Sequence, residues 1–292
     1  MKEVFDFTAY TGCFTLVPFS FAKHSSIGCG GESPVAFYPS TIEELCALVV
    51  KLKEEGIVFR VVGNLTNTLP PDERTDFVII CTKRLKGISL GEQVFVEAGV
   101  TSGVLLQACK TQGYSGAEFL TGIPCTLGGA AYMNAGADGR YIADILESVL
   151  VLRNGELCTL FPADCGYAYK QSVFMQNDDI ILGASLRLQK ASDEEISSRV
   201  RYYADRRAHL PAGKSMGCIF KNPDGKSAGQ LIEGSGLKGM RIGGARVSTQ
   251  HANFILNDGN ATTKDICALI TLIKNAVWAQ YGVRLQEEIR YL

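Results

Sequence analysis

The sequence predicts an α+β fold, in which strands, hairpins and helices are interspersed rather than regularly alternating. Asn154-Gly155 lies between two apolar runs and is a strong β-hairpin signal. Apolar residues at helical spacing recur over 42–52 and 266–277. The loop Gly63–Asn67 follows a predicted strand, but it lacks a Gly-x-Gly-x-x-Gly fingerprint and no helix clearly follows it. A doubly wound nucleotide-binding sheet is therefore disfavoured.

The first half of the chain supplies two helices and three short strands. Thr41 and Glu44 form a capping box for a helix that ends at Gly56. A second helix begins at Thr101 or Ser102 and runs to about residue 112. Strands are expected over 57–62, 77–81 and 94–97. The expected inward faces of the two helices are Ile42, Leu45, Cys46, Val49 and Leu52 in the first, and Val104, Leu105 and Ala108 in the second.

The second half begins with the hairpin, 146–152 and 156–160, and a strand over 180–188. A charged helix over 191–207 is interpreted as the joint between domains. Beyond it we expect strands over 218–220 and 253–256, a helix over 228–233, and an edge strand over 283–289. The last long helix starts at Thr262 or Thr263 and buries Ile266, Leu269, Ile270, Ile273 and Val277.

Composition excludes several classes of protein. The 292 residues are 46% hydrophobic and 20% charged, with a formal net charge of -1, so nucleic acid is a poor candidate partner. The ten cysteines include no Cys-x-x-Cys pair, which argues against structural zinc, and we expect no metal. Free cysteines fit a reducing cytosol, and we find neither a signal peptide nor a membrane span. We expect a cytoplasmic monomer.

Residues Gly122–Gly136 organise the chain. This stretch holds four glycines and no charged side chain, so its main chain can approach a ligand closely. Pro124 lacks an N–H, and the remaining N–H groups are expected to be free to face an anionic or polar ligand. A buried turn between strands is the alternative, and a glycine-rich run alone does not decide between the two.

Several motifs together resemble one family. Gly122–Gly136 resembles the flavin-binding signature of the UDP-N-acetylenolpyruvoylglucosamine reductase (MurB) family. Gly63–Asn67 is similar to its glycine-serine-asparagine loop, with Leu65 and Thr66 in place of a glycine and the serine. Further segments resemble the family in the same order along residues 20–292, namely Tyr169–Phe174, Gly217–Pro223, Leu231–Gly239, Gly243–Asn257 and Leu285–Arg290.

The resemblance implies a fold and a division into domains. It implies a vanillyl-alcohol-oxidase (PCMH) type FAD-binding region in two subdomains, about 1–82 and 83–190. An α+β substrate domain over 191–292 would follow. The cofactors would be FAD and NADPH, with no separate dinucleotide fingerprint for the latter in the sequence.

The resemblance also implies an activity. NADPH would reduce the flavin, which would reduce the enolpyruvyl group of UDP-N-acetylglucosamine-enolpyruvate to UDP-N-acetylmuramate, a peptidoglycan precursor needed for the cell wall, cell shape and division. The partner would be this UDP-sugar. Lys170 matches an arginine that contacts the substrate's charge, Cys218 a proton-donating serine, and Glu288 a catalytic glutamate. Without the motif, Glu287 is an equally good acid.

The resemblance assigns the remaining residues to ligands. Tyr169, Lys221 and Asn222 would contact the substrate. The residues expected to line the flavin are Gly63, Asn64, Leu65, Thr66, Asn67, Gly122, Ile123, Pro124, Thr126, Gly128, Gly129, Asn134 and Gly136. His24 and His251 receive no catalytic role.

Two departures from the family keep other functions open. A lysine at 170 retains the charge but lacks the bidentate fork of arginine. A thiol at 218 is a stronger acid than a hydroxyl and is more easily oxidised. Another FAD oxidoreductase of the same fold, such as an oxidase, and a non-catalytic flavin-binding paralogue are the alternatives.

Overall fold

The computed structural model describes residues 17–292, and within it the chain divides into two compact units. Unit 1 includes Val35–Asn64 and Phe77–Arg207. Unit 2 is assembled from three stretches, Phe19–Pro34, Leu65–Asp76 and Ala208–Leu292. The sequence-based boundaries at 82/83 and 190/191 stay a prediction.

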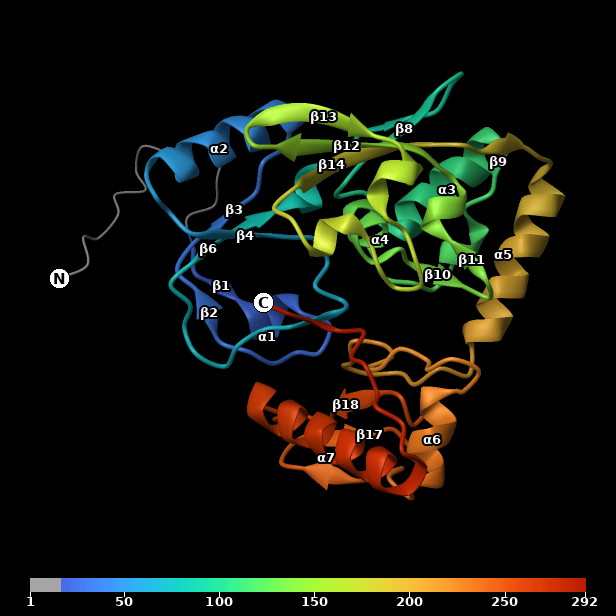
Figure 1. Cartoon of the computed structure of the whole chain (residues 1–292). Helices are drawn as coiled ribbons and strands as arrows, with labels where there is room; N and C mark the ends of the chain where they lie inside the picture. Colours follow the sequence, from blue (N-terminus) through green and yellow to red (C-terminus); the bar gives the residue numbers. More distant parts are fainter. Residues whose placement is uncertain (1–16) are drawn as a thin grey trace. The chain divides into compact units, whose positions relative to one another are not determined.

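A parallel three-stranded sheet forms one part of unit 1. Its order is β3 (Ala36–Phe37), β6 (Val78–Cys81) and β4 (Phe59–Val62), and α2 (Ile42–Glu54) lies beside it (Figure 1). Thr41 caps α2 by accepting a hydrogen bond from the Glu44 N–H, as the sequence predicts. Leu45, Leu48, Val49 and Leu52 are the buried side chains of this helix.

An antiparallel five-stranded sheet forms the other part. Its order is β13 (Glu156–Leu160), β12 (Leu146–Arg153), β14 (Ile180–Leu186), β8 (Val94–Glu97) and β7 (Ile88–Ser89). The predicted hairpin joins β12 to β13. Asn154 and Gly155 both have positive φ, 52° and 89°, which is the backbone that an Asn-Gly hairpin turn requires.

Short elements surround this sheet. They are α3 (Ser102–Gln112), α4 (Leu127–Met133), α5 (Asp193–Arg207), the pair β9 (Tyr114–Ser115) and β15 (Gln189–Lys190), and the pair β10 (Gly136–Ala137) and β11 (Arg140–Tyr141). In α3 Leu105 is buried, but Val104 is 53% exposed, so the predicted inward position of Val104 is wrong. Cys109, one turn beyond Leu105, is buried in its place.

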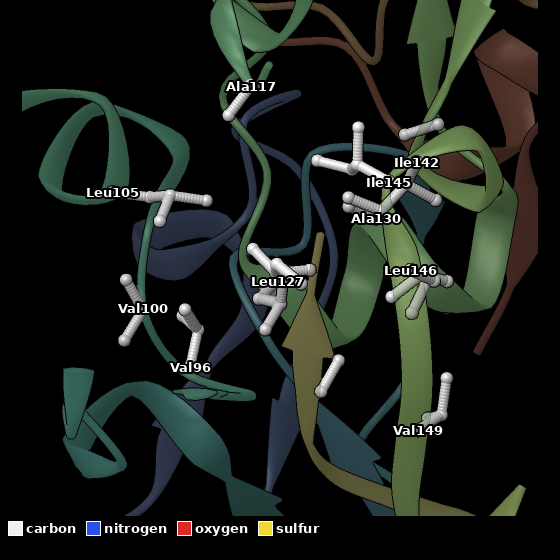
Figure 2. Packing of buried hydrophobic residues seen from close by; sticks show 14 of the residues in the cluster. Val96, Val100, Leu105, Ala117, Leu127, Ala130, Ile142, Ile145, Leu146 and Val149 are labelled. Atoms are coloured by element: carbon white, nitrogen blue, oxygen red, sulfur yellow. The ribbon is translucent and has the colours of Figure 1, made fainter. Parts of the chain in front are cut away.

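The main core of unit 1 packs α4 against the five-stranded sheet. Figure 2 shows Leu127 and Ala130 of α4 in the cluster that holds Val96 of β8 and Leu146 and Val149 of β12. Ala130, Val96 and Val149 are fully buried. This packing fixes the glycine-rich stretch to a rigid support.

Unit 2 has its own core around the long helix α7 (Thr263–Tyr281). Helix α6 (Ala228–Gly234) and the antiparallel sheet β16 (Arg241–Ile242), β17 (Ala245–Val247) and β18 (Ile255–Asn257) pack against α7 (Figure 1). The other elements are β1 (Phe19–Ser20), α1 (Phe21–His24), β2 (Glu32–Ser33), β5 (Thr68–Leu69) and β19 (Arg290–Tyr291). The five residues predicted to be the buried face of α7 are all buried, and Thr262 with Asp265 forms its capping box.

Two predicted strands of unit 2 are reduced to single bridges. The stretch 218–220 pairs through isolated bridges only, and of 283–289 only Glu287 forms one, opposite Phe220. Leu285 and Ile289 are buried, so packing rather than a ladder holds this segment. Across residues 17–292, no helix has both the length and the apolarity needed to cross a membrane.

Candidate functional site

The glycine-rich stretch contains a short helix that the sequence analysis did not anticipate. Thr126 caps α4, since its hydroxyl accepts a hydrogen bond from the Gly129 N–H at 3.2 Å. Asn134 ends the helix in the left-handed region, with φ of 43°. Thr126 is 1% exposed and Asn134 is 4% exposed, so both ends are fixed within the fold.

Formation of α4 uses N–H groups that were expected to face a ligand. Leu127 donates to the Val100 carbonyl at 2.8 Å, and Gly128 donates to the Ala98 carbonyl at 2.9 Å. The expectation of free N–H groups is therefore wrong for these residues, because the helix docks against the end of β8.

The second predicted cofactor loop converges on this stretch within unit 1. The Asn64 side-chain amide donates to the Pro124 carbonyl at 2.9 Å. Gly63 lies against the Thr126 hydroxyl, and a Cβ at position 63 would collide with it. The structure therefore brings together Gly63, Asn64, Pro124 and Thr126, as expected for one binding surface.

Main chain is exposed on the surface left by these contacts. Gly122, Pro124 and Gly129 are exposed, and the two glycines present main chain without a side chain. The Arg207 Nε lies 3.0 Å from where a Cβ on Gly122 would be, so a positive charge borders the bare backbone. Arg207 is a candidate cofactor contact that the sequence analysis missed, because the helix 191–207 was interpreted only as a joint.

Asn134 and Gly136 have structural roles in this surface. The Asn134 side chain donates to the Ala168 carbonyl at 2.9 Å and accepts from the Ala143 N–H at 3.3 Å. A Cβ on Gly136 would collide with the Arg140 carbonyl across the β10–β11 pair. Ile123 is half-buried and packs on the core. Contacts of these residues with flavin stay a prediction.

Tyr169 and Lys170 form the tip of a tight turn beside the same surface. Ala168 and Gln171 exchange two backbone hydrogen bonds, at 3.2 and 3.1 Å, and Lys170 has a positive φ of 53°. Burial raises the pKa of the neighbouring Cys125 to about 11, and the charges of Arg207 and Lys170 partly oppose that rise. Lys170 therefore lies near enough to Cys125 for its charge to oppose the raised pKa of that thiol.

The chain passes from unit 1 to unit 2 between Asn64 and Leu65, so the predicted loop is divided. Leu65 is buried with φ of 52°, a conformation that glycine adopts without strain. Thr66 is half-buried. The Asn67 side-chain amide donates to the Glu288 carbonyl at 3.1 Å, and the Asn67 carbonyl accepts from the Arg290 N–H at 2.9 Å.

Within unit 2, the segment that carries Cys218 pairs with the segment that carries Glu288. The Glu288 N–H donates to the Ile219 carbonyl at 2.8 Å, and the Lys221 N–H donates to the Gln286 carbonyl at 2.8 Å. Cys218 and Glu288, which lie 70 positions apart in the sequence, are therefore held in adjacent backbone segments. The third predicted catalytic residue, Lys170, belongs to unit 1.

A buried amide holds the Cys218 segment from its other side. The Asn253 side chain accepts from the Phe220 N–H at 2.9 Å and donates to the Phe220 carbonyl at 2.8 Å. Asn253 is 3% exposed. The sequence analysis missed this residue, although an amide within the apolar run 252–256 was a signal for a buried hydrogen-bonding role.

The two predicted substrate residues of this segment differ in their surroundings. The Asn222 side-chain oxygen accepts from the Ala228 N–H at 3.0 Å, which fixes the start of α6. Lys221 is half-buried, and its main chain is held beside Gln286. Contact of either residue with substrate stays a prediction.

The structure shows the partners of Glu287, the first of the two neighbouring glutamates. The Glu287 carboxylate accepts from the Lys274 ammonium at 2.9 Å and from the Tyr291 hydroxyl at 2.6 Å, one on each oxygen. Both oxygens of Glu287 are thereby engaged within the protein. The role of Glu288 as the acid of the site stays a prediction from the motif. In the part of the chain from 17 onward, no three His, Cys, Asp or Glu side chains are grouped so as to hold a metal ion.

Two family models match the chain in the two regions just described. The model "FAD binding domain" matches residues 33–160, and "UDP-N-acetylenolpyruvoylglucosamine reductase, C-terminal domain" matches residues 208–292. The UDP-N-acetylenolpyruvoylglucosamine reductase of Geobacter metallireducens is 39% identical to the chain and covers 92% of it, with 91% of that relative's own length covered.

Solved structures agree with these matches. The UDP-N-acetylenolpyruvylglucosamine reductase of Thermus caldophilus superimposes with a TM-score of 0.82 at 33% identity, over 94% of this chain and 97% of that one. A solvent-stable cholesterol oxidase matches at 18% identity with a TM-score of 0.50, over 63% of this chain and 39% of that chain, a likeness of fold alone. The predicted fold class, with its FAD-binding region, is confirmed. Because the Geobacter relative is 39% identical over 92% of the chain and the two family models match its two regions, the chain belongs to the UDP-N-acetylenolpyruvoylglucosamine reductase family.

Proposed function

We propose that the chain is an FAD-dependent reductase that uses NADPH to convert UDP-N-acetylglucosamine-enolpyruvate to UDP-N-acetylmuramate in peptidoglycan precursor synthesis. The printed names of its relatives support the reaction class and the UDP-sugar substrate. The observation that carries the proposal is the backbone pairing of the Cys218 and Glu288 segments, which brings two of the three expected catalytic residues into adjacent segments of unit 2.

Unit 1 would hold the cofactor. Gly122 and Gly129 offer bare backbone, and the Asn64 amide fixes the carbonyl of Pro124. Bound FAD, once reduced by NADPH, supplies the hydride for the carbon–carbon double bond. Protein side chains would stabilise the resulting charge and donate the proton.

Reduction of the double bond leaves negative charge on the carbon next to the substrate carboxylate. The Lys170 ammonium would stabilise this charge, and a preorganised donor of this kind contributes about 3–4 kcal/mol. The Cys218 thiol would donate its proton to that carbon, with Glu288 assisting. A thiol is a competent donor because its ordinary pKa, about 8.5, is far below that of a hydroxyl. Tyr169, Lys221 and Asn222 would bind the UDP-sugar.

The decisive experiment measures NADPH oxidation by flavin-loaded protein with and without the enolpyruvyl UDP-sugar. Oxidation that depends on this sugar and forms UDP-N-acetylmuramate in equal amount is expected. Flavin that is reoxidised by oxygen and ignores the sugar would instead identify an oxidase, and yellow protein without turnover would identify a non-catalytic flavin binder.

We also propose that the protein is a cytoplasmic monomer. The nine cysteines from Cys29 to Cys267 are free thiols, which suits a reducing compartment. Sedimentation of the purified protein near 31.6 kDa, and its recovery in the soluble fraction of the native cell, are the expected results.

A further inference from the structure

The Glu287 carboxylate joins two elements of unit 2. Lys274 reaches it from α7, and Tyr291 reaches it from β19. The Glu287 side chain is only 20% exposed and the Lys274 side chain 44%, so the ion pair is partly shielded from water. Hydrogen bonds to a charged partner are stronger than neutral ones. We call Lys274, Glu287 and Tyr291 the brace.

The brace is next to the backbone hydrogen bond that holds Glu288. Glu287 forms a bridge with Phe220, and its two neighbours bond to the Cys218 segment on either side of that bridge. A shift at Glu287 would therefore move the Glu288 N–H relative to its acceptor, the Ile219 carbonyl.

The opposite side of Glu288 is held by a different loop. Asn67 bonds both the Glu288 carbonyl and the Arg290 N–H, and β19 continues as a parallel pair with β5. The Lys274–Glu287 ion pair links this segment to α7, the longest helix of the unit, and the Tyr291 hydroxyl also contacts Cys267 of that helix. The main chain of Glu288 is therefore held by Ile219 on one side and by the Asn67 side chain on the other, while Lys274 holds the C-terminal segment, residues 286–292, against that helix.

We propose that Lys274 and Tyr291 are positioning residues that act on the reaction through Glu287, by fixing the orientation of Glu288. The proposal rests on the proposed function. Neither residue need touch the substrate. A displacement of about 1 Å at a reacting group can lower a rate by as much as about 100-fold, so loss of one contact of the brace is expected to produce a measurable part of that effect.

Variants at Lys274 and Tyr291 test the brace, and a variant at Lys264 on the same helix is the matched control. Lys274→Met removes the charge and keeps the stem, while Lys274→Arg keeps the charge. Lys264→Met is the control, because Lys264 pairs with Glu73 at 3.6 Å with both side chains exposed, 82% and 71%. Tyr291→Phe tests the other arm by removing one hydroxyl.

The two half-reactions are measured separately by stopped flow. In Lys274→Met and Tyr291→Phe, reduction of bound flavin by NADPH should match the parent, and reoxidation by the enolpyruvyl UDP-sugar should slow by about tenfold at saturating sugar. Lys274→Arg and Lys264→Met should match the parent in both steps. Amide hydrogen exchange at Glu288 and Arg290 should rise in Lys274→Met and not in Lys264→Met.

Coupling to Glu288 decides between positioning and general destabilisation. In a Glu288→Gln background, Lys274→Met should cause no further slowing, because the group that it positions is already absent. Equal additional slowing in that background, slowing of both half-reactions, or no slowing in either brace variant would overturn the proposal. A parent protein that never reduces the UDP-sugar would instead overturn the proposed function, whatever the exchange data show.

Discussion

Replacement of Asn253 by alanine should destabilise unit 2 by an amount that follows from its two hydrogen bonds. Both bonds go to the backbone of Phe220, which is 1% exposed, so the variant leaves one N–H and one carbonyl buried without their partner. An unsatisfied buried group costs about 1–3 kcal/mol, and two give about 2–6 kcal/mol. We expect about 2–4 kcal/mol, since a water in the vacated space can pair with both groups.

Urea unfolding followed by tryptophan fluorescence reports on this unit directly. Trp278 is the single tryptophan of the chain and lies on α7, with the Arg284 guanidinium 4.9 Å from its ring centroid. Asn260→Ala is the matched control, because Asn260 belongs to the same unit and is exposed. A surface change of this kind stays within about 0.5 kcal/mol. If Asn253→Ala unfolds at the same urea concentration as Asn260→Ala, the Asn253 bonds do not hold the Cys218 segment.

Three further predictions concern the site and its surroundings. Cys218→Ala should leave flavin reduction by NADPH intact and slow only the second half-reaction, while Cys218→Ser should retain activity; stopped-flow rates that fall equally in both halves would remove Cys218 from the proposed role. Thr126→Val should cost about 1 kcal/mol in thermal unfolding by removing the cap of α4, and should weaken FAD uptake in a fluorescence titration; unchanged uptake would separate the cap from the cofactor surface. Burial is the largest cause of the lowered pKa of His251, so the folded protein favours the neutral imidazole. The resulting contribution to the free energy of unfolding is fully present above the unfolded pKa near 6.5 and is lost as the pH falls below it. Urea midpoints of the parent should therefore fall more steeply than those of His251→Gln between about pH 7.5 and 5.

Local signals predicted the elements that local interactions determine. The Asn154-Gly155 turn, the Thr41 cap and the buried face of α7 each depend on residues within a few positions of one another. Helix α4 escaped prediction because its glycines have low helix propensity, and its stability depends on packing against β8.

The structure brings part of the predicted site together, and the roles of its residues stay a prediction. The motifs named Gly63, Asn64 and the Gly122–Gly136 stretch, and the structure brings these together in unit 1. The Asn253 contact and the brace depend on pairs such as Lys274 with Glu287, in which tertiary packing alone brings the partners together. The same packing gives the Glu287 carboxylate its two partners, Lys274 and Tyr291, which the sequence alone does not show.

The three-part construction of unit 2 has a consequence for its synthesis. The Asn257 side chain donates to the Ile27 carbonyl at 2.9 Å, and Ser26 donates to the Ser215 carbonyl. Residues near the start of the chain therefore form hydrogen bonds with residues near its end. At ribosomal rates, residues 19–34 would wait on the order of 10–50 s for β18 and α7 to emerge. A gene fragment that starts at residue 208 would encode unit 2 without Phe19–Pro34 and Leu65–Asp76, the two stretches that complete it. A chaperone that shields the nascent N-terminal stretch would therefore aid this fold more than one that acts after release.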